Sequence, residues 1–150
     1  MVSQRHGLVP TFQFASDSET AVKTRSIVFV LLGVAVLVLK RYYTGPLHEV
    51  VYAYAGNLSI SFALYFYLRF SLGTVAYIDS RFPTGIKKLV AASVALAAVE
   101  LFEAFDGFGV MSNTYDPIDF LANPIGIALG YWLDTKLGTA RTEHARTIAS

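Results

Sequence analysis

Residues 26–39 read SIVFVLLGVAVLVL, and no charged side chain interrupts the chain there before Lys40 and Arg41. With its flanks, from Ala21 to Tyr43, the stretch is long enough to cross a hydrocarbon layer of about 30 Å as a helix. The stems of Lys40 and Arg41 can lie along that layer while their charges reach the interface. The stretch predicts a membrane-spanning helix, and a buried core helix is the alternative for so short an uncharged run.

The composition of the whole chain favours the same environment. Hydrophobic residues make up 54% of the 150 residues and charged residues 15%, whereas an average soluble domain has about 25% charged residues. The mean hydropathy is +0.48. A net charge of +1 gives no long-range attraction for nucleic acid, and the absence of cysteine excludes disulfides and thiolate metal sites. These values argue against a disordered chain, a nucleic-acid binder and a typical water-soluble enzyme.

Three further segments are predicted to span, which gives four spans at residues 21–43, 47–70, 86–105 and 117–137. Val50 to Leu68 carries no charge and has tyrosines towards both ends, as the aromatic belts of membrane helices do. We therefore predict an all-α fold, a polytopic four-helix transmembrane bundle over residues 26–137. A cytosolic tail is expected at residues 1–25 and another at 138–150. The apolar stretch 70–78 is too short to span and should extend the second helix or lie in the interface.

The distribution of basic residues predicts the orientation, because cytoplasmic loops are enriched in lysine and arginine. Four spans put both termini on one side. With that side cytoplasmic, only Lys40 and Arg41 fall outside. The ten inner basic residues are Arg5, Lys23, Arg25, Arg69, Arg81, Lys87, Lys88, Lys136, Arg141 and Arg146. We expect a multi-pass protein of the cell membrane with both termini in the cytoplasm and with a basic inner rim that contacts anionic lipid.

Polar residues gather at the predicted outer ends of the spans. Glu100 and Glu103 are three residues apart, so they share one face of the third span. An ionisable group inside a span costs at least about 2–3 kcal/mol at mid-depth, and such groups usually pair or line a watery cavity. The sequence predicts a binding cluster whose members are His48, Glu49, Glu100, Glu103, Asp116, Asp119 and Asn123.

Several chemistries fit this cluster. Carboxylate and amide oxygens could bind a divalent cation such as Mg²⁺ or Ca²⁺, and the same groups could relay protons or hold a cationic headgroup. Glu100 and Asp119 are the candidate acid and base of a catalytic site. Local roles are the alternative: Asp116 as a helix N-cap, and Asn123 as a partner for backbone groups that Pro124 frees. No known catalytic motif accompanies the cluster, and no other cofactor is predicted.

Small residues form a ridge along the fourth span, because Ala122, Gly126 and Gly130 are spaced four apart. Such a ridge lets another helix approach closely. That helix belongs either to the same bundle or to a partner, which would be a second copy of the chain or another membrane protein.

Residues 100–103, ELFE, and residues 115–130, YDPIDFLANPIGIALG, resemble the closing half of VanZ-like membrane proteins. That family typically has a glutamate late in the third span and a D-x-x-D-x-x-x-N-x-x-G pattern that opens the fourth. The matching positions are Glu100, Asp116, Asp119, Asn123 and Gly126. The resemblance implies an association with the envelope of a bacterium or archaeon and, through the family's namesake, a link to glycopeptide resistance. It implies no settled chemistry.

The function that these observations favour is binding, as an envelope-associated protein or an accessory subunit of a larger membrane complex. Membrane lipids and a membrane-protein partner are the expected contacts. An enzyme acting on a lipid-linked or phosphate-bearing envelope substrate through the outer carboxylates is the alternative, and a carrier is a third reading.

Overall fold

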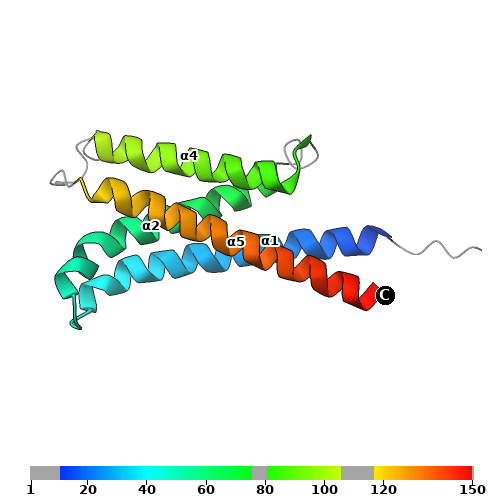
Figure 1. The fold of residues 1–150 in the computed structure, drawn as a ribbon, viewed down its shortest axis with the longest axis horizontal. Helices are drawn as coiled ribbons and strands as arrows, with labels where there is room; N and C mark the ends of the chain where they lie inside the picture. The colour runs from blue at the N-terminus through cyan, green and yellow to red at the C-terminus, as the bar shows by residue number, and fades with distance from the viewer. Residues whose placement is uncertain (1–10, 76–80, 106–116, 150) are drawn as a thin grey trace, which may run out of the picture.

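The computed structural model of the chain describes residues 11–75, 81–105 and 117–149, with side chains from residue 20 to residue 139 of those ranges. These residues form four long helices: α1 (Thr11–Leu39), α2 (His48–Thr74), α4 (Thr84–Ala104) and α5 (Asp119–Ala149). A short 3₁₀ helix, η1 (Lys40–Tyr42), follows α1. Consecutive long helices run antiparallel, and α1 begins at the end of the bundle where α5 finishes (Figure 1). The predicted all-α class is confirmed for the described residues.

The turns between helices use residues that suit a chain reversal. Leu47, directly before α2, has φ of 60° and so lies in the left-handed region. The hydroxyl of Tyr43 donates to the carbonyl oxygen of Pro46 at 2.9 Å and closes this turn. Pro83 precedes α4 in an extended conformation, and because proline has no N–H to donate, it is well suited to a position at a helix start.

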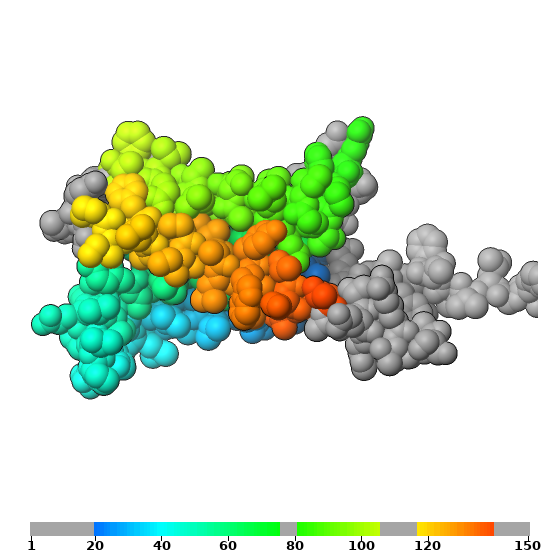
Figure 2. All heavy atoms as spheres, in the orientation of Figure 1, coloured from blue at the N-terminus to red at the C-terminus, as the bar shows by residue number. Residues whose placement is uncertain are grey.

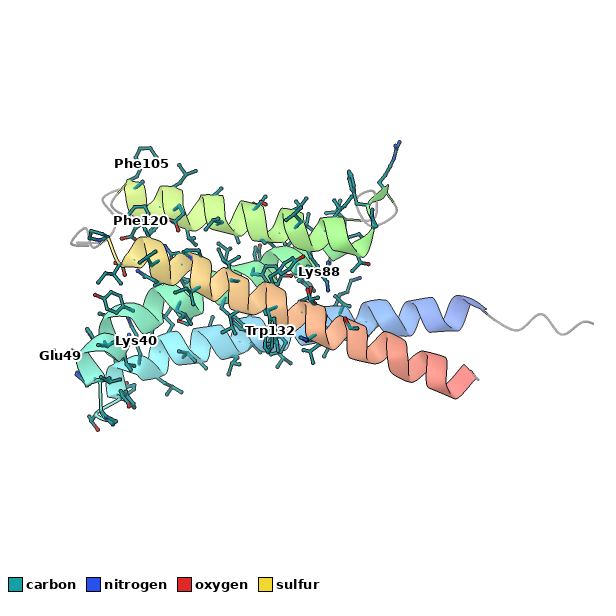
Figure 3. All side chains as sticks on the ribbon, in the orientation of Figure 1. Lys40, Glu49, Lys88, Phe105, Phe120 and Trp132 are labelled. Atoms are coloured by element: carbon teal, nitrogen blue, oxygen red, sulfur yellow. The ribbon has the colours of Figure 1, made fainter. Side chains whose placement is uncertain are left out.

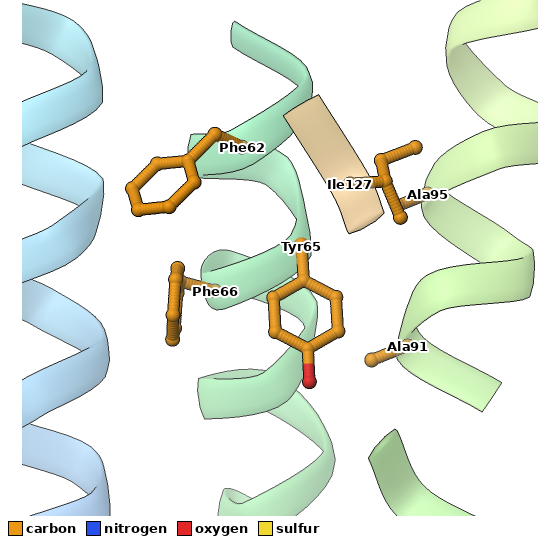
Figure 4. Packing of buried hydrophobic residues seen from close by; sticks show 6 residues of the cluster. All are labelled: Phe62, Tyr65, Phe66, Ala91, Ala95 and Ile127. Carbon is orange, nitrogen blue, oxygen red and sulfur yellow. The ribbon is translucent and has the colours of Figure 1, made fainter. Parts of the chain in front are cut away.

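The second helix is the centre of the bundle, because α2 packs against α1, α4 and α5, and α4 also packs on α5. Small residues allow the close approaches. A Cβ on Gly33 of α1 would lie 2.8 Å from both the Cβ of Ala63 and the carbonyl oxygen of Ser59 in α2. Aromatic and small side chains fill the core between these helices (Figure 4), and its members are Phe62, Tyr65, Phe66, Ala91, Ala95 and Ile127.

The polarity of the bundle is inverted relative to a water-soluble protein. Among the described residues, nine polar or charged residues are buried, against eight apolar ones. Every long helix exposes large apolar side chains, for example Leu31 (62% exposed), Leu89 (60%) and Leu121 (63%). Lysine, arginine and carboxylate side chains are almost never fully buried in soluble domains unless they are paired.

By length and composition, Thr20–Tyr42 is the one segment of the described residues that could cross a membrane. It covers the predicted first span, 21–43, as far as Tyr42, and most of its side chains are exposed on the bundle. The remaining helices are as long as a span requires, with 27 residues in α2, 21 in α4 and 31 in α5. Buried polar residues lower their hydropathy; Arg69, Lys87 and Asp134 are examples.

Helix bounds differ from the predicted domain bounds at both termini. The structure begins α1 at Thr11, inside the predicted tail 1–25, and continues α5 to Ala149, through the predicted tail 138–150. Hydropathy predicts where a membrane would end, whereas a helix can continue into water through residues of good helix propensity. The apolar residues after Leu68 extend α2 to Thr74, one of the two outcomes expected for them.

Candidate functional site

One buried polar group joins α2 to α5 near the end where α5 begins. The hydroxyl of Ser61 donates to Oδ1 of Asn123 at 2.8 Å, and both side chains are buried. Asp119, one helical turn before Asn123, is also buried, as is Glu103 near the end of α4. We call Ser61, Glu103, Asp119 and Asn123 the outer polar group. Three of the predicted cluster residues therefore lie in the interior at one end of the bundle.

Glu100 lies one turn before Glu103 on α4. Its Oε1 is buried and has no hydrogen-bond partner among the described residues. A buried carboxylate oxygen without a partner is costly. At this end of the bundle, Oε1 of Glu100 can therefore accept a proton or a hydrogen bond from a ligand.

His48 and Glu49 do not join the outer polar group, contrary to the prediction. Both are exposed at the start of α2, where His48 stacks on Tyr52 with ring centroids 6.0 Å apart. A helix rises 1.5 Å per residue, so Glu49 lies about 18 Å along α2 from Ser61. Figure 3 shows Glu49 at the tip of α2, well away from Phe105 and Phe120. The sequence places these residues on the same side but does not show which turn of α2 lies level with Asn123; in the structure it is the turn that contains Ser61.

Lys40, which follows α1 at the start of η1, has a local role. Lys40 donates to the carbonyl oxygen of Tyr52 at 2.9 Å, and its Nζ lies 5.3 Å from the centroid of the Tyr52 ring. This contact ties η1 to the first turns of α2.

The predicted divalent-cation site gains no support from the described residues, in which no group of three or more His, Cys, Asp or Glu side chains could hold a metal ion. Asp116, the remaining member of the predicted cluster, lies outside the described residues. Its predicted N-cap role lies outside them too; α5 begins at Asp119.

The ridge of small residues on α5 faces α2 of the same chain. A Cβ on Gly126 would meet the backbone of Leu58, and one on Gly130 would lie 2.9 Å from the Tyr65 ring. Ala122 is buried on the same face. Of the two alternatives for this ridge, the structure shows packing within the bundle.

A second buried polar group surrounds Asp134, which the sequence analysis did not select. Asp134 is 1% exposed. Its Oδ2 accepts from the hydroxyl of Tyr65 at 3.1 Å and from Nε of Arg69 at 3.2 Å. Arg25 forms an ion pair with its other carboxylate oxygen, and Lys88 donates to its carbonyl oxygen at 3.1 Å. All four long helices contribute to this group, which we call the Asp134 group: Arg25, Tyr65, Arg69, Lys88 and Asp134.

The sequence predicts part of the Asp134 group. Arg25, Arg69 and Lys88 are among the inner basic residues, for which contact with anionic lipid is expected. In the structure Arg69 is 4% exposed, and its side chain points into the bundle. Asp134 is a carboxylate within a predicted span and at the same depth as several basic residues. Because such groups usually pair inside the bundle, its pairing with these basic residues could have been predicted.

No protein family, curated protein or solved structure matches this chain. The VanZ-like resemblance therefore remains a prediction from the residues between Glu100 and Gly130.

Proposed function

We propose that this chain is a four-span membrane protein with both termini on the cytoplasmic side. The observation that carries the proposal is the inverted polarity of the bundle, with apolar side chains outside and charged ones inside. In lipid, ionisable side chains face the interior of a helix bundle and pair there, as Arg69 and Asp134 do. In a water-soluble protein it would be unfavourable to bury Arg69 while many large apolar side chains stay exposed to solvent.

The modest hydropathy of α2, α4 and α5 is compatible with this topology. Their polar residues lie largely where helices meet, so the lipid-facing surface is more apolar than the average over each helix. Ser61 and Asn123 satisfy one another, and Asp134 satisfies partners from three other helices. Antiparallel helices of 21 residues or more are long enough to span.

We further propose that the protein acts by binding, as an envelope-associated protein or an accessory subunit of a larger membrane complex. The buried contacts of Asn123 and Asp134 join different helices, and Asp134 alone contacts residues of three other helices. Lipid-facing surfaces on α1 and α4 remain free of other helices of the chain. The VanZ-like pattern is a further argument, from sequence, for the envelope association.

An enzyme acting on a lipid-linked or phosphate-bearing substrate is the second candidate. The observation that favours it is the buried Oε1 of Glu100, which has no hydrogen-bond partner among the described residues, at the end of the bundle where Asp119 is also buried. A carboxyl group held in this way could act as a general acid or base towards a substrate that enters at this end.

Single-cysteine labelling tests the topology, and the chain has no cysteine of its own. Thr44, between η1 and α2, and Thr84, at the start of α4, are both exposed. We expect a cysteine at position 44 to react with an impermeant reagent only from outside, and one at 84 only from the cytoplasm. Labelling of both from the same side would contradict the four-span proposal, and release of the chain by alkaline carbonate would contradict membrane insertion.

Purification of the full chain in its native lipids tests binding against catalysis. An accessory subunit should co-elute with a second polypeptide in fixed ratio, and E100Q and D119N should preserve that co-elution. Elution of the chain alone would contradict the accessory role. Loss of the cellular activity in E100Q and D119N, with insertion intact, would support the enzyme instead.

A further inference from the structure

A mostly apolar groove of about 300 Å³ runs between α4 and α5. Leu89 and Leu96 form its α4 side, and Pro124, Ala128 and Tyr131 are on its α5 side. Figure 2 shows the face on which these two helices lie side by side. The volume is at the lower end of the range for small-molecule sites. Under the proposed four-span topology this groove opens towards lipid.

A lysine lies at one end of the groove. Lys88 precedes the groove residue Leu89, and its Nζ reaches α5 at the carbonyl oxygen of Asp134, 3.1 Å away and one turn beyond Tyr131. The side chain of Lys88 is 12% exposed, so part of it is reachable from outside. A Cβ on Gly138 would lie 3.4 Å from this Nζ, and glycine therefore leaves the approach to the amine free of a side chain. Figure 3 labels Lys88 at this position between the helices.

The Asp134 group carries more positive than negative charge. Three cationic side chains, Arg25, Arg69 and Lys88, share the single carboxylate of Asp134. Charges that are removed from water interact strongly and favour a compensating counter-charge. Lys88 is the member of this group that directly precedes a residue of the groove, Leu89, so an anion at this end of the groove would be positioned to supply that charge.

The depth of Lys88 suits the headgroup of a membrane lipid. Lys88 lies sixteen residues before Ala104, the last residue of α4. Sixteen residues of helix are about 24 Å long, so with Ala104 at the outer boundary Lys88 would lie close to the inner boundary of a hydrocarbon layer about 30 Å thick. The remaining distance to the inner interface is about 6 Å, roughly one turn of a helix. The groove extends from the level of Lys88 towards the middle of the hydrocarbon layer, the same direction in which a lipid acyl chain extends from its headgroup.

We propose that the α4–α5 groove binds an acyl chain of an anionic phospholipid whose phosphate is held by Lys88 at the inner interface. This proposal rests on the proposed four-span topology. A second copy of the chain is a less suitable occupant. Copies inserted in the same orientation would bring two positively charged Asp134 groups to the same depth, where they would repel.

Native mass spectrometry of the full chain, with phosphatidylglycerol and phosphatidylcholine added in equal amounts, tests the proposal. We expect the anionic lipid to bind about fivefold more tightly, the factor that corresponds to about 1 kcal/mol per basic residue near an anionic surface. K88Q should reduce this preference to near unity, and K88R should keep it. K136Q removes an exposed lysine of α5, the other helix of the groove, and should also keep it. A128F fills the groove and should weaken the binding of both lipids.

Three results would overturn the lipid site: an unchanged preference in K88Q, an equal loss in K136Q, or unchanged binding in A128F. A disulfide-linked dimer of A128C in native membranes would also overturn it, because a second copy would then cover the groove. Carbonate extraction and labelling at positions 44 and 84 are measured on the same variants. Failure of the lipid site with these two readouts intact leaves the four-span proposal standing, whereas their failure removes both.

Discussion

Replacement of Gly126 by alanine is the sharpest test of the packing of α5 on α2. The added Cβ would meet the carbonyl oxygen of Leu58 and would lie 3.1 Å from its carbonyl carbon and 3.2 Å from its Cα. All three atoms belong to backbone, which cannot rotate away as a side chain can. The helices must therefore separate, and the buried hydrogen bond from Ser61 to Asn123 would lengthen from 2.8 Å.

The magnitude follows from two opposing contributions. Overpacking of a close contact costs about 1–3 kcal/mol, and a contact with backbone should lie in the upper part of that range. Alanine has a helix propensity about 1 kcal/mol better than that of glycine, which offsets part of the cost. The expected net loss of stability for G126A is about 1–2 kcal/mol. Gly73 of α2 provides the matched control, because a Cβ there would meet nothing within 4 Å, and G73A should gain up to about 1 kcal/mol.

The free energy of unfolding of both variants can be measured in mixed micelles by titration with sodium dodecyl sulfate, followed by circular dichroism. G126A should unfold at a lower detergent fraction than the wild type, and G73A at the same or a higher fraction. G130A should fall between them, because its Cβ would meet the Tyr65 ring, which can shift, rather than backbone. Equal stabilisation of G126A and G73A would refute the close approach of α5 to α2.

Two further predictions concern the buried polar groups. D134N keeps the shape of the side chain but leaves Arg25 and Arg69 without their carboxylate, so it should cost about 3–5 kcal/mol in the same unfolding assay; wild-type stability would show that the cations do not depend on Asp134. S61A should cost about 0.6–1.7 kcal/mol, the range for a hydrogen bond between membrane helices. The double variant S61A/N123A should lose less free energy of unfolding than the sum of the losses of the two single variants. Strictly additive losses would argue against the hydrogen bond between Ser61 and Asn123.

Much of the fold could be predicted from the sequence. The uncharged run from Ser26 to Leu39 lies within α1, and His48 opens α2 as the expected start of a second helix. These predictions succeed because helix length and hydropathy are local properties of the chain. In the structure α1 begins before the predicted span 21–43 and α5 continues past the predicted span 117–137, because a loss of hydropathy marks a change of solvent and not the end of a helix.

The candidate site was predicted only in part. Glu103, Asp119 and Asn123 are buried at one end of the bundle, since consecutive antiparallel helices bring the end of α4 to the start of α5. His48 was expected beside them and is instead exposed, because it opens α2 thirteen residues before Ser61, about 20 Å along the helix. Such an offset depends on how helices slide along one another, and no spacing within a single helix records it.

The sequence by itself determined the helical class and the approximate positions of the four long helices of the described residues, because each depends on a contiguous run of residues and on the polar residues that flank it. Only the tertiary structure decided the partners. Asp134 gathers Arg25, Arg69 and Lys88 from three other helices, and Gly126 lies against the backbone of Leu58. The rotation of each helix about its axis selects these contacts, and that rotation is set by all the packed side chains together.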